Sequence, residues 1–556
     1  MAEPLSSSSP RVDEFQSLTS SAFEKLSSVT GTAKGLNGFT LGTAIMVVLV
    51  FALNSLLLPS HDSREPPVAK PSIPILGHMI GFARNSFTYY NILTKKLGQP
   101  IFTILMPGRR IYVVTKPDLV VQVDRQNKKF SFAPIVYEFS KVTCGVGKEA
   151  TEILGQNLLG EHGNWGLCED MVIGMRESLK PGDNLDSMNR IMAEDICQSL
   201  DATKPEPGKE FRLINLQEWV AYVVTMATTN SVYGPHNPYK RKDVRDAFWV
   251  FEKGIMKMLV HPFPKYAAKD ALEARDFVTN VLNEYFINGH HKQGSGLAQA
   301  RFNYSVKNNV PVEDIGRFEI GGTIAILVNT LPSCYWILLL IHYVPGLLEE
   351  IRKEVDAALI IDKEKNHVTI DITTIKNNCP LLLSTLKESL RYRGIGTALR
   401  IVTQDTVVGG YLLKKDSMVQ IPLQVIHGDE KHWGEHAMDF DPYRFVKDPA
   451  SGKKLPDDSG YRSFGGGKHL CPGRFFATNE ILAVVGLFIS RYEMRPASGK
   501  WDLPTTFNSN AATQISQPDF EMEMEVRNRA GYEQYTWNVE LRKSNKVVAV
   551  LSGDGQ

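Results

Sequence analysis

The sequence has very few cysteines and no excess of either charge. Its 556 residues include six cysteines, which are scattered and form no Cys-x-x-Cys pair. This excludes a disulfide framework and a zinc knuckle and fits a reducing compartment. The 62 Lys and Arg against 61 Asp and Glu leave a formal charge of +1, so we expect no nucleic-acid partner. A mean hydropathy of −0.17 argues against a polytopic membrane protein.

The N-terminal region contains one long stretch without any charged residue. Residues 36–59 hold no Lys, Arg, Asp or Glu and are long enough to cross a bilayer as one helix, so we expect a transmembrane anchor. Residues 1–35 are rich in Ser and Thr and predict a disordered tail. Closely spaced prolines in residues 60–74 predict a semi-rigid spacer. The positive charges flanking the anchor are balanced and do not predict its orientation.

No further linker divides the rest of the chain. We expect one large body over residues 75–545, followed by a short tail over residues 546–556. Most of this body reads as helix. Alternating segments at Ile101–Met106 and Arg110–Val114 predict a small strand pair that turns at Pro107-Gly108.

A long apolar helix is predicted from about Asp314 to about His342. Its stretch Ile324–Ile341 has no charge, so it is either a second membrane span or the central buried helix of a large domain. Asn329 and Pro332 inside it favour the buried helix, with a kink at Pro332. A second helix is predicted from about residue 381 to 392. Residues 433–471 have no clear period and predict a long ordered loop of the kind that is usually functional.

That loop ends in the sequence Phe464-Gly-Gly-Gly-Lys-His-Leu-Cys471-Pro-Gly-Arg474. The glycines allow the backbone to curl closely, and Pro472 suits the first turn of a following helix. A helix N-terminus favours an anion, so Cys471 is placed to be a thiolate. Such a thiolate can be a nucleophile, a redox centre or a metal ligand.

The loop resembles the haem-binding loop of cytochromes P450, Phe-x-x-Gly-x-(Arg/His)-x-Cys-x-Gly. The matching residues are Phe464, Gly467, His469, Cys471 and Gly473. The resemblance implies haem b as cofactor, with Cys471 as the axial ligand of its iron and His469 at a haem propionate. Arg400, in a strand after the helix at 381–392, is a second propionate candidate, unless it is simply a charge on the surface of the strand.

Two further motifs extend the resemblance. Glu388 and Arg391 stand at i and i+3 of a helix, and Arg444 follows in a Pro-x-Arg-Phe-like segment. In the family these three form a Glu–Arg–Arg network that holds the Cys loop. The match runs from Ile73 to about Arg527 and implies a mainly α fold with small β-sheets, preceded by one transmembrane helix. The family's Trp-x-x-x-Arg contact to the haem is not visible. Four residues after Trp165 the chain has Glu169 instead of an arginine, and Arg176 stands too far along the chain.

The central helix departs from most of the family. Where an acid–Thr pair usually relays protons, this chain has Asn329 and Thr330. This stretch is similar to the clan of sterol and bile-acid hydroxylases and prostacyclin synthase, and we expect a fungal-type member. Retention of Thr330 favours a monooxygenase with Thr330 and Asn329 as catalytic residues. A haem-thiolate isomerase or dehydratase acting on a peroxide, and a non-catalytic haem-binding protein, remain alternatives.

The resemblance also implies substrates and partners. Residues 130–146 and 511–516 fall where the family binds its substrate, and their apolar or small side chains suit a lipophilic molecule such as a sterol, terpenoid or other secondary metabolite. Electrons would come from NADPH through NADPH–cytochrome P450 reductase, with the catalytic domain on the cytosolic side of the endoplasmic reticulum membrane. Five basic residues near the loop form either a docking face or a solvated run of charges. These are Lys453, Lys454, Arg462, Lys468 and Arg474.

Overall fold

The computed structural model describes residues 57–261, 263–447, 455–456, 459–510 and 512–541. The predicted tails at residues 1–35 and 546–556, and residues 36–56 of the predicted anchor, lie outside the described residues.

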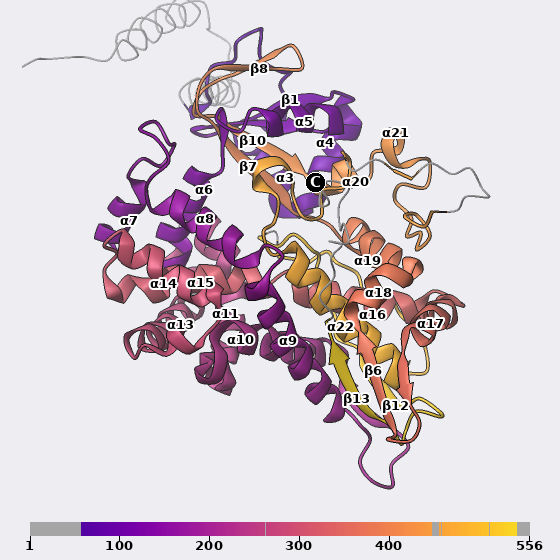
Figure 1. The fold of residues 1–556 in the computed structure, drawn as a ribbon. Coiled ribbons are helices and arrows are strands. Elements are labelled where there is room, and N and C mark those ends of the chain that lie inside the picture. Colours follow the sequence, from indigo (N-terminus) through magenta and orange to yellow (C-terminus); the bar gives the residue numbers. More distant parts are fainter. Residues whose placement is uncertain (1–56, 262, 448–454, 457–458, 511, 542–556) are drawn as a thin grey trace, which may run out of the picture.

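The five-stranded sheet lies at one end of the described chain, while β6, β12 and β13 of the smaller sheets lie at the other end among the helices (Figure 1). One five-stranded sheet has the order β1-β2-β10-β7-β3, and two three-stranded sheets have the orders β11-β12-β4 and β13-β6-β5. The strands are β1 (Ile101–Met106), β2 (Arg109–Val114), β3 (Phe130–Ser131), β4 (Arg212–Asn215), β5 (Ile360–Asp362), β6 (His367–Asp371), β7 (Thr397–Val402), β8 (Thr406–Val408), β9 (Tyr411–Leu413), β10 (Met418–Pro422), β11 (Tyr492–Pro496), β12 (Glu523–Asn528) and β13 (Thr536–Glu540).

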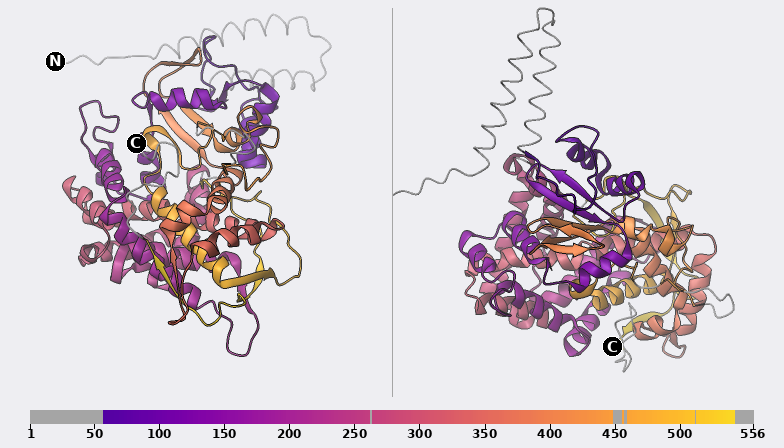
Figure 2. Two further views of the ribbon diagram at one scale, coloured as in Figure 1. Left: turned by 45° about the vertical axis from the view of Figure 1, so that its right-hand side comes forward. Right: turned by 90° about the horizontal axis from the view of Figure 1, so that it is seen from above.

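Helices make up most of the molecule, as Figure 2 shows from two further sides. The mainly α fold with small sheets is therefore confirmed. The helices are α3 (Gly77–Asn85), α4 (Tyr89–Leu97), α5 (Pro117–Arg125), α6 (Ala133–Phe139), α7 (Lys148–Gly155), α8 (Leu167–Leu179), α9 (Asp183–Asp201), α10 (Leu216–Tyr233), α11 (Lys242–Val260), α12 (Pro264–Ala267), α13 (Lys269–Ile287), α14 (Gly296–Lys307), α15 (Val312–Leu327), α16 (Thr330–Tyr343), α17 (Leu347–Ala358), α18 (Ile372–Asn378), α19 (Pro380–Tyr392), α20 (Leu423–His427), α21 (Glu430–Trp433) and α22 (Arg474–Arg491).

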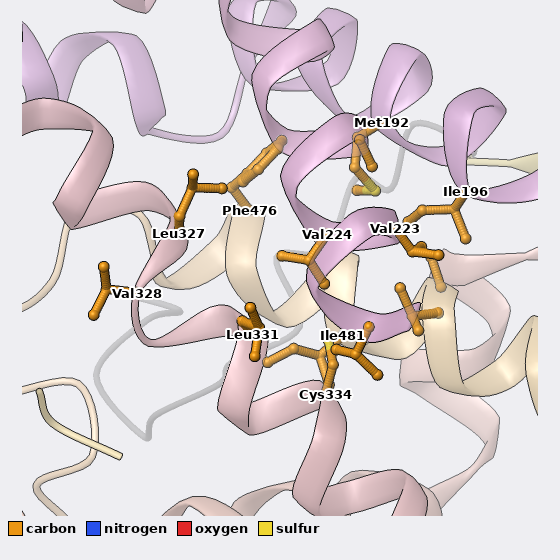
Figure 3. Close-up of a cluster of buried hydrophobic side chains, with 14 of the residues drawn as sticks. Met192, Ile196, Val223, Val224, Leu327, Val328, Leu331, Cys334, Phe476 and Ile481 are labelled. Carbon is orange, nitrogen blue, oxygen red and sulfur yellow. The ribbon is translucent and has the colours of Figure 1, made fainter. Parts of the chain in front are cut away.

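The apolar core forms where α9, α10, α16 and α22 pack against one another. Figure 3 shows this region, with Leu331 and Cys334 of α16 facing Ile481 of α22 and Val224 of α10. All side chains from Thr330 to Ile341 are buried. The segment Val312–Tyr343 is apolar and long enough to cross a membrane, but 78% of its most apolar window is buried inside the fold. The prediction of a buried central segment is therefore confirmed.

The central segment is two helices rather than one, which corrects the sequence prediction. Helix α15 ends at Leu327 and α16 begins at Thr330, so the break lies at Val328-Asn329 and not at Pro332. Pro332 falls in the first turn of α16. A backbone N–H has no partner inside the helix at that position, so a proline there costs little.

The predicted hairpin is present: β1 and β2 pair antiparallel, and Gly108 at their turn has φ of 66°. The proline-rich segment is attached to this hairpin for part of its length. Ala69 N–H donates to the Thr103 carbonyl and Thr103 N–H donates to the Pro67 carbonyl, each at 2.8 Å. Glu65 is buried and accepts from the Tyr112 hydroxyl at 2.7 Å. Residues 65–69 are thus an integral part of the folded body.

Candidate active site

Cys471 lies at the end of the long loop, three residues before α22 begins. Its N–H donates to the Phe464 carbonyl at 2.8 Å, which closes the loop on itself. Gly465 and Gly467 have φ of 80° and 56°. A Cβ on Gly465 would lie 2.8 Å from the His469 carbonyl oxygen, and one on Gly467 would lie 2.9 Å from the Cβ of Asp124. Both positions therefore require glycine.

Two opposing influences act on the Cys471 thiol. Desolvation raises its pKa, whereas the backbone N–H groups of Gly473 and Arg474 and the charge of Arg474 lower it. The other five cysteines are buried, but Cys471 is partly exposed. Since desolvation is the largest influence, the helix N-terminus alone does not make the thiolate. A bound cation such as a metal ion would do so.

Glu388 and its two arginines form a buried cluster behind this loop. Arg391 donates through Nε and Nη2 to the two carboxylate oxygens of Glu388, each at 2.7 Å. Arg444 Nε donates to Glu388 Oε2 at 3.1 Å. Arg391 Nη1 also donates to the carbonyls of His427 and Ala437, both at 2.6 Å. The three predicted residues thus lie together, and they tie α19 to the segment between α20 and the Cys loop.

Arg400 and His469 form a second group beside the loop. Arg400 is 4% exposed, which excludes a charge on the surface of the strand. Desolvation lowers its pKa to about 10. Burial, and then the charge of Arg400, lower the pKa of His469 to about 4, and His469 Nε2 has no hydrogen-bond partner among the described residues. The Phe132 ring lies near both, 5.7 Å from the Arg400 guanidinium and 5.9 Å from the His469 ring.

Two arginines near the loop differ from the sequence predictions. Arg462 is buried and paired with Asp124, with its Nη1 at 2.7 Å from Asp124 Oδ2, so it is not part of an exposed docking face. Lys453 and Lys454 of that face lie outside the described residues. On sequence grounds Arg176 stands too far from Trp165 to complete the Trp-x-x-x-Arg motif. In the structure it donates from the last turn of α8 to the Lys468 carbonyl.

The break in the central helix contacts two loops. Asn329 Oδ1 accepts from the Gln514 N–H at 2.8 Å. The Gln514 carbonyl accepts from the N–H groups of Ile395 and Gly396, at 2.9 and 3.1 Å. The Thr330 hydroxyl donates to the Ile326 carbonyl at a long 3.4 Å. Asn329 is therefore committed to the loop that contains Gln514, while the Thr330 hydroxyl is held only weakly.

These residues fit a haem. A thiol beside a helix N-terminus suits the iron. Haem also carries two propionate carboxylates, and these need cationic or donor groups. The buried Arg400 guanidinium, which forms no ion pair among the described residues, and the unpaired His469 Nε2 supply such groups.

Comparisons with known proteins agree with this geometry. The family model "Cytochrome P450" matches residues 66–522. A cytochrome P450 monooxygenase nodJ from Hypoxylon pulicicidum is 31% identical over 523 residues, covering 92% of this chain and 99% of that protein. A cytochrome P450 monooxygenase from Gibberella zeae is 28% identical, covering 88% and 94%. The crystal structure of the cytochrome P450DA heme domain has a TM-score of 0.64 at 17% identity, covering 85% and 99%. The chain belongs to the cytochrome P450 family and is an enzyme of its monooxygenase class.

Proposed function

We propose that this protein is a haem-thiolate monooxygenase that inserts one oxygen atom of O₂ into a C–H bond of a lipophilic small molecule. A sterol, a terpenoid or another secondary metabolite is the expected substrate. The observation that carries the proposal is the Cys471 loop, which places the partly exposed Cys471 at a helix N-terminus and His469 near the buried Arg400 guanidinium.

The residues of the loop and those packed around it each have a proposed role in holding the haem. Cys471 would ligate the iron, and Arg400 and His469 would bind the propionates. Phe464, Gly467 and Gly473 shape the loop around the sulfur. Glu388, Arg391 and Arg444 would hold the loop against α19 through their buried ion pairs. When bound, the haem supplies the binding and activation of dioxygen, with a thiolate ligand favouring O–O cleavage.

Thr330 and Asn329 take different parts in this proposal. The Thr330 hydroxyl makes one long hydrogen bond, so its Oγ1 is available to hold a water and to pass a proton. The Asn329 amide oxygen is occupied by Gln514 N–H. Asn329 therefore acts by keeping the helix break and the neighbouring loop in place, and Thr330 is the proposed proton-handling group.

The substrate class rests on the side chains of two segments. Residues 130–146 form β3, α6 and a π-helical turn, with apolar side chains that include Phe132, Val136 and Phe139. The second segment, described from residue 512, carries small side chains and contacts the break in the central helix through Gln514. Apolar and small side chains of this kind suit a lipophilic molecule. The likeness to fungal monooxygenases supports a secondary metabolite.

NADPH–cytochrome P450 reductase is the proposed electron donor. We place the protein in the endoplasmic reticulum membrane as a single-pass protein with a cytosolic catalytic domain. The charge-free residues 36–59 support the anchor, because a span of this length without charges is stable in lipid. A cytosolic domain is accessible to both the reductase and NADPH.

The test uses the full-length protein in liposomes with the reductase. Candidate lipophilic substrates are offered with NADPH and isotopically labelled O₂. The proposal expects one labelled oxygen atom in the product and no product without NADPH. Conversion of a peroxide without NADPH would instead support the isomerase or dehydratase, and haem binding without any turnover would support a non-catalytic protein. Thr330→Val should lower the product formed per NADPH severalfold, and Thr330→Ser, which keeps the hydroxyl, is the matched control.

A further inference from the structure

A buried histidine stands between the two best-defined parts of the site. His427 is the last residue of α20 and is 2% exposed. It lies between the end of α19, which carries Glu388 and Arg391, and Arg462. This arginine begins the last part of the long loop, residues 462–471, which we call the Cys loop. No sequence motif pointed to it.

Both ring nitrogens of His427 are used. Nδ1 lies 3.0 Å from the Arg391 carbonyl oxygen, and Nε2 lies 3.0 Å from the Arg462 backbone nitrogen. A carbonyl only accepts and a backbone N–H only donates. The ring must therefore be neutral, with its proton on Nδ1 and a free lone pair on Nε2. In a protonated ring Nε2 would itself be a donor facing the Arg462 N–H, and the second hydrogen bond would be lost.

The surroundings of the ring keep it in this state. Burial, and then the charge of Arg391, lower the pKa of His427 to about 3. Its ring is nearly parallel to that of Tyr461, with centroids 6.2 Å apart and an interplanar angle of 21°. A Cβ added to Gly394 would lie 3.1 Å from Nδ1, so the backbone of Gly394 approaches the ring closely. The ring is thus confined in position as well as in charge.

Backbone hydrogen bonds connect Arg462, which this ring holds, to the backbone N–H of Cys471. The Arg462 carbonyl accepts from Gly465 N–H at 2.9 Å, and the Phe464 carbonyl accepts from Cys471 N–H at 2.8 Å. The Arg462 side chain is fixed separately by Asp124. The imidazole therefore holds the first turn of the Cys loop to the backbone of α19.

We propose that His427 is a positioning residue that sets the place of the Cys471 sulfur by bridging Arg391 of α19 to Arg462 of the Cys loop. This inference rests on the proposed haem-thiolate function. It adds a neutral hydrogen-bonded link to the charged link that Glu388, Arg391 and Arg444 provide.

The test compares His427→Phe, His427→Gln and the control His436→Phe in the full-length holoenzyme. Phe keeps a ring against Tyr461 but loses both hydrogen bonds, and Gln keeps an amide that can replace one of them. His436 is exposed and lies nine residues along the chain. We expect the thiolate-type CO complex of His427→Phe to convert to the protonated type roughly tenfold faster. We also expect a shifted iron reduction potential, intermediate values for His427→Gln, and wild-type values for His436→Phe.

The inference would be overturned if the thiolate-type CO complex of His427→Phe lasted as long as that of wild type and its iron reduction potential were unchanged. If His427→Phe does not retain haem, hydrogen exchange over residues 459–471 of His427→Gln decides instead. Roughly tenfold faster exchange supports the bridge, and unchanged exchange overturns it. Failure of the proposed function is recognised separately, because the wild-type protein itself would then lack the thiolate-type CO complex.

Discussion

The Cys loop and the break in the central helix lie in one fold but are held in different ways. The loop is supported by buried charged groups, with Glu388 shared by Arg391 and Arg444 and with Arg462 paired to Asp124. The break is joined to the neighbouring loop through a neutral hydrogen bond, from Gln514 N–H to the Asn329 amide oxygen. The difference is one of chemistry: buried charged groups fix the Cys loop, whereas the contact between the helix break and the loop around Gln514 is neutral.

The largest expected effect removes the thiol itself. Cys471→Ser should abolish the thiolate-type CO spectrum and all turnover, because a hydroxyl at this position is not ionised near neutral pH and is a poor ligand for iron. Cys379→Ser, at a fully buried cysteine, is the matched control and should keep the spectrum. Difference spectra of the reduced CO complex measure both. Survival of the thiolate-type band in Cys471→Ser would show that the ligand has been misassigned.

The next effect breaks the charged support. Arg391→Ala should destabilise the protein by about 3–5 kcal/mol, because it leaves the Glu388 carboxylate buried with one partner fewer. Arg495→Ala removes an exposed partner of Glu525 and should cost about 0–1 kcal/mol. Urea unfolding of the two full-length variants measures the difference. Equal losses would mean that the loop is no better supported than the surface.

A buried carboxyl group in the core, that of Glu480, should make the stability of the protein depend on pH. Glu480 of α22 is buried, accepts from the Thr228 hydroxyl at 2.5 Å, and has its pKa raised by desolvation from 4.5 to about 8. Between these values the native state holds a proton that the unfolded state has released, so stability falls as pH rises from about 4.5 to about 8. Glu480→Gln should remove this slope and gain on the order of 4 kcal/mol at pH 8 relative to wild type, at about 1.4 kcal/mol per pKa unit.

Thermal or urea unfolding from about pH 4 to about pH 9 measures this effect, because this range brackets both pKa values of the carboxyl group. Glu525→Gln, at a partly exposed carboxylate on β12, serves as the control. If wild type and Glu480→Gln fall in parallel across this range, Glu480 is ionised in the native state.

The smallest effect changes the neutral contact. Asn329→Leu should cost about 1–3 kcal/mol, because it leaves the Gln514 N–H without its acceptor. Asn329→Asp keeps an acceptor oxygen and should cost much less. Hydrogen exchange over residues 512–517 measures the loosening of the loop in each variant. Similar exchange in the two variants would remove Asn329 from the support of this loop and weaken the contrast with the Cys loop.

The sequence predicted the parts of the site whose residues lie close together in the chain. The Cys471 loop and the Glu388–Arg391 pair each occupy a few consecutive positions, so motif and helical spacing were enough to find them. It failed for Arg176, Arg462 and His427. Their partners are 292, 338 and 35 residues away, and no local pattern encodes such distances.

The central helix gives the same lesson in its local structure. Pro332 is the strongest helix-breaking signal in the segment, yet the break falls at Asn329. A proline in the first turn lacks only a hydrogen bond that the helix would not have made there. The break coincides with the hydrogen bond between Asn329 and Gln514, two residues that are 185 positions apart in the chain.

The sequence by itself determined the family, the mainly helical fold and the identity of the thiol, because these follow from residues at short, fixed spacings and from the balance of apolar and charged side chains. Only the tertiary structure decided which arginines are buried, where the central helix breaks, and that the neutral imidazole of His427 links α19 to the Cys loop. The reason is physical. Burial and hydrogen bonding are properties of what surrounds a group in space, and most of those surroundings come from distant parts of the chain.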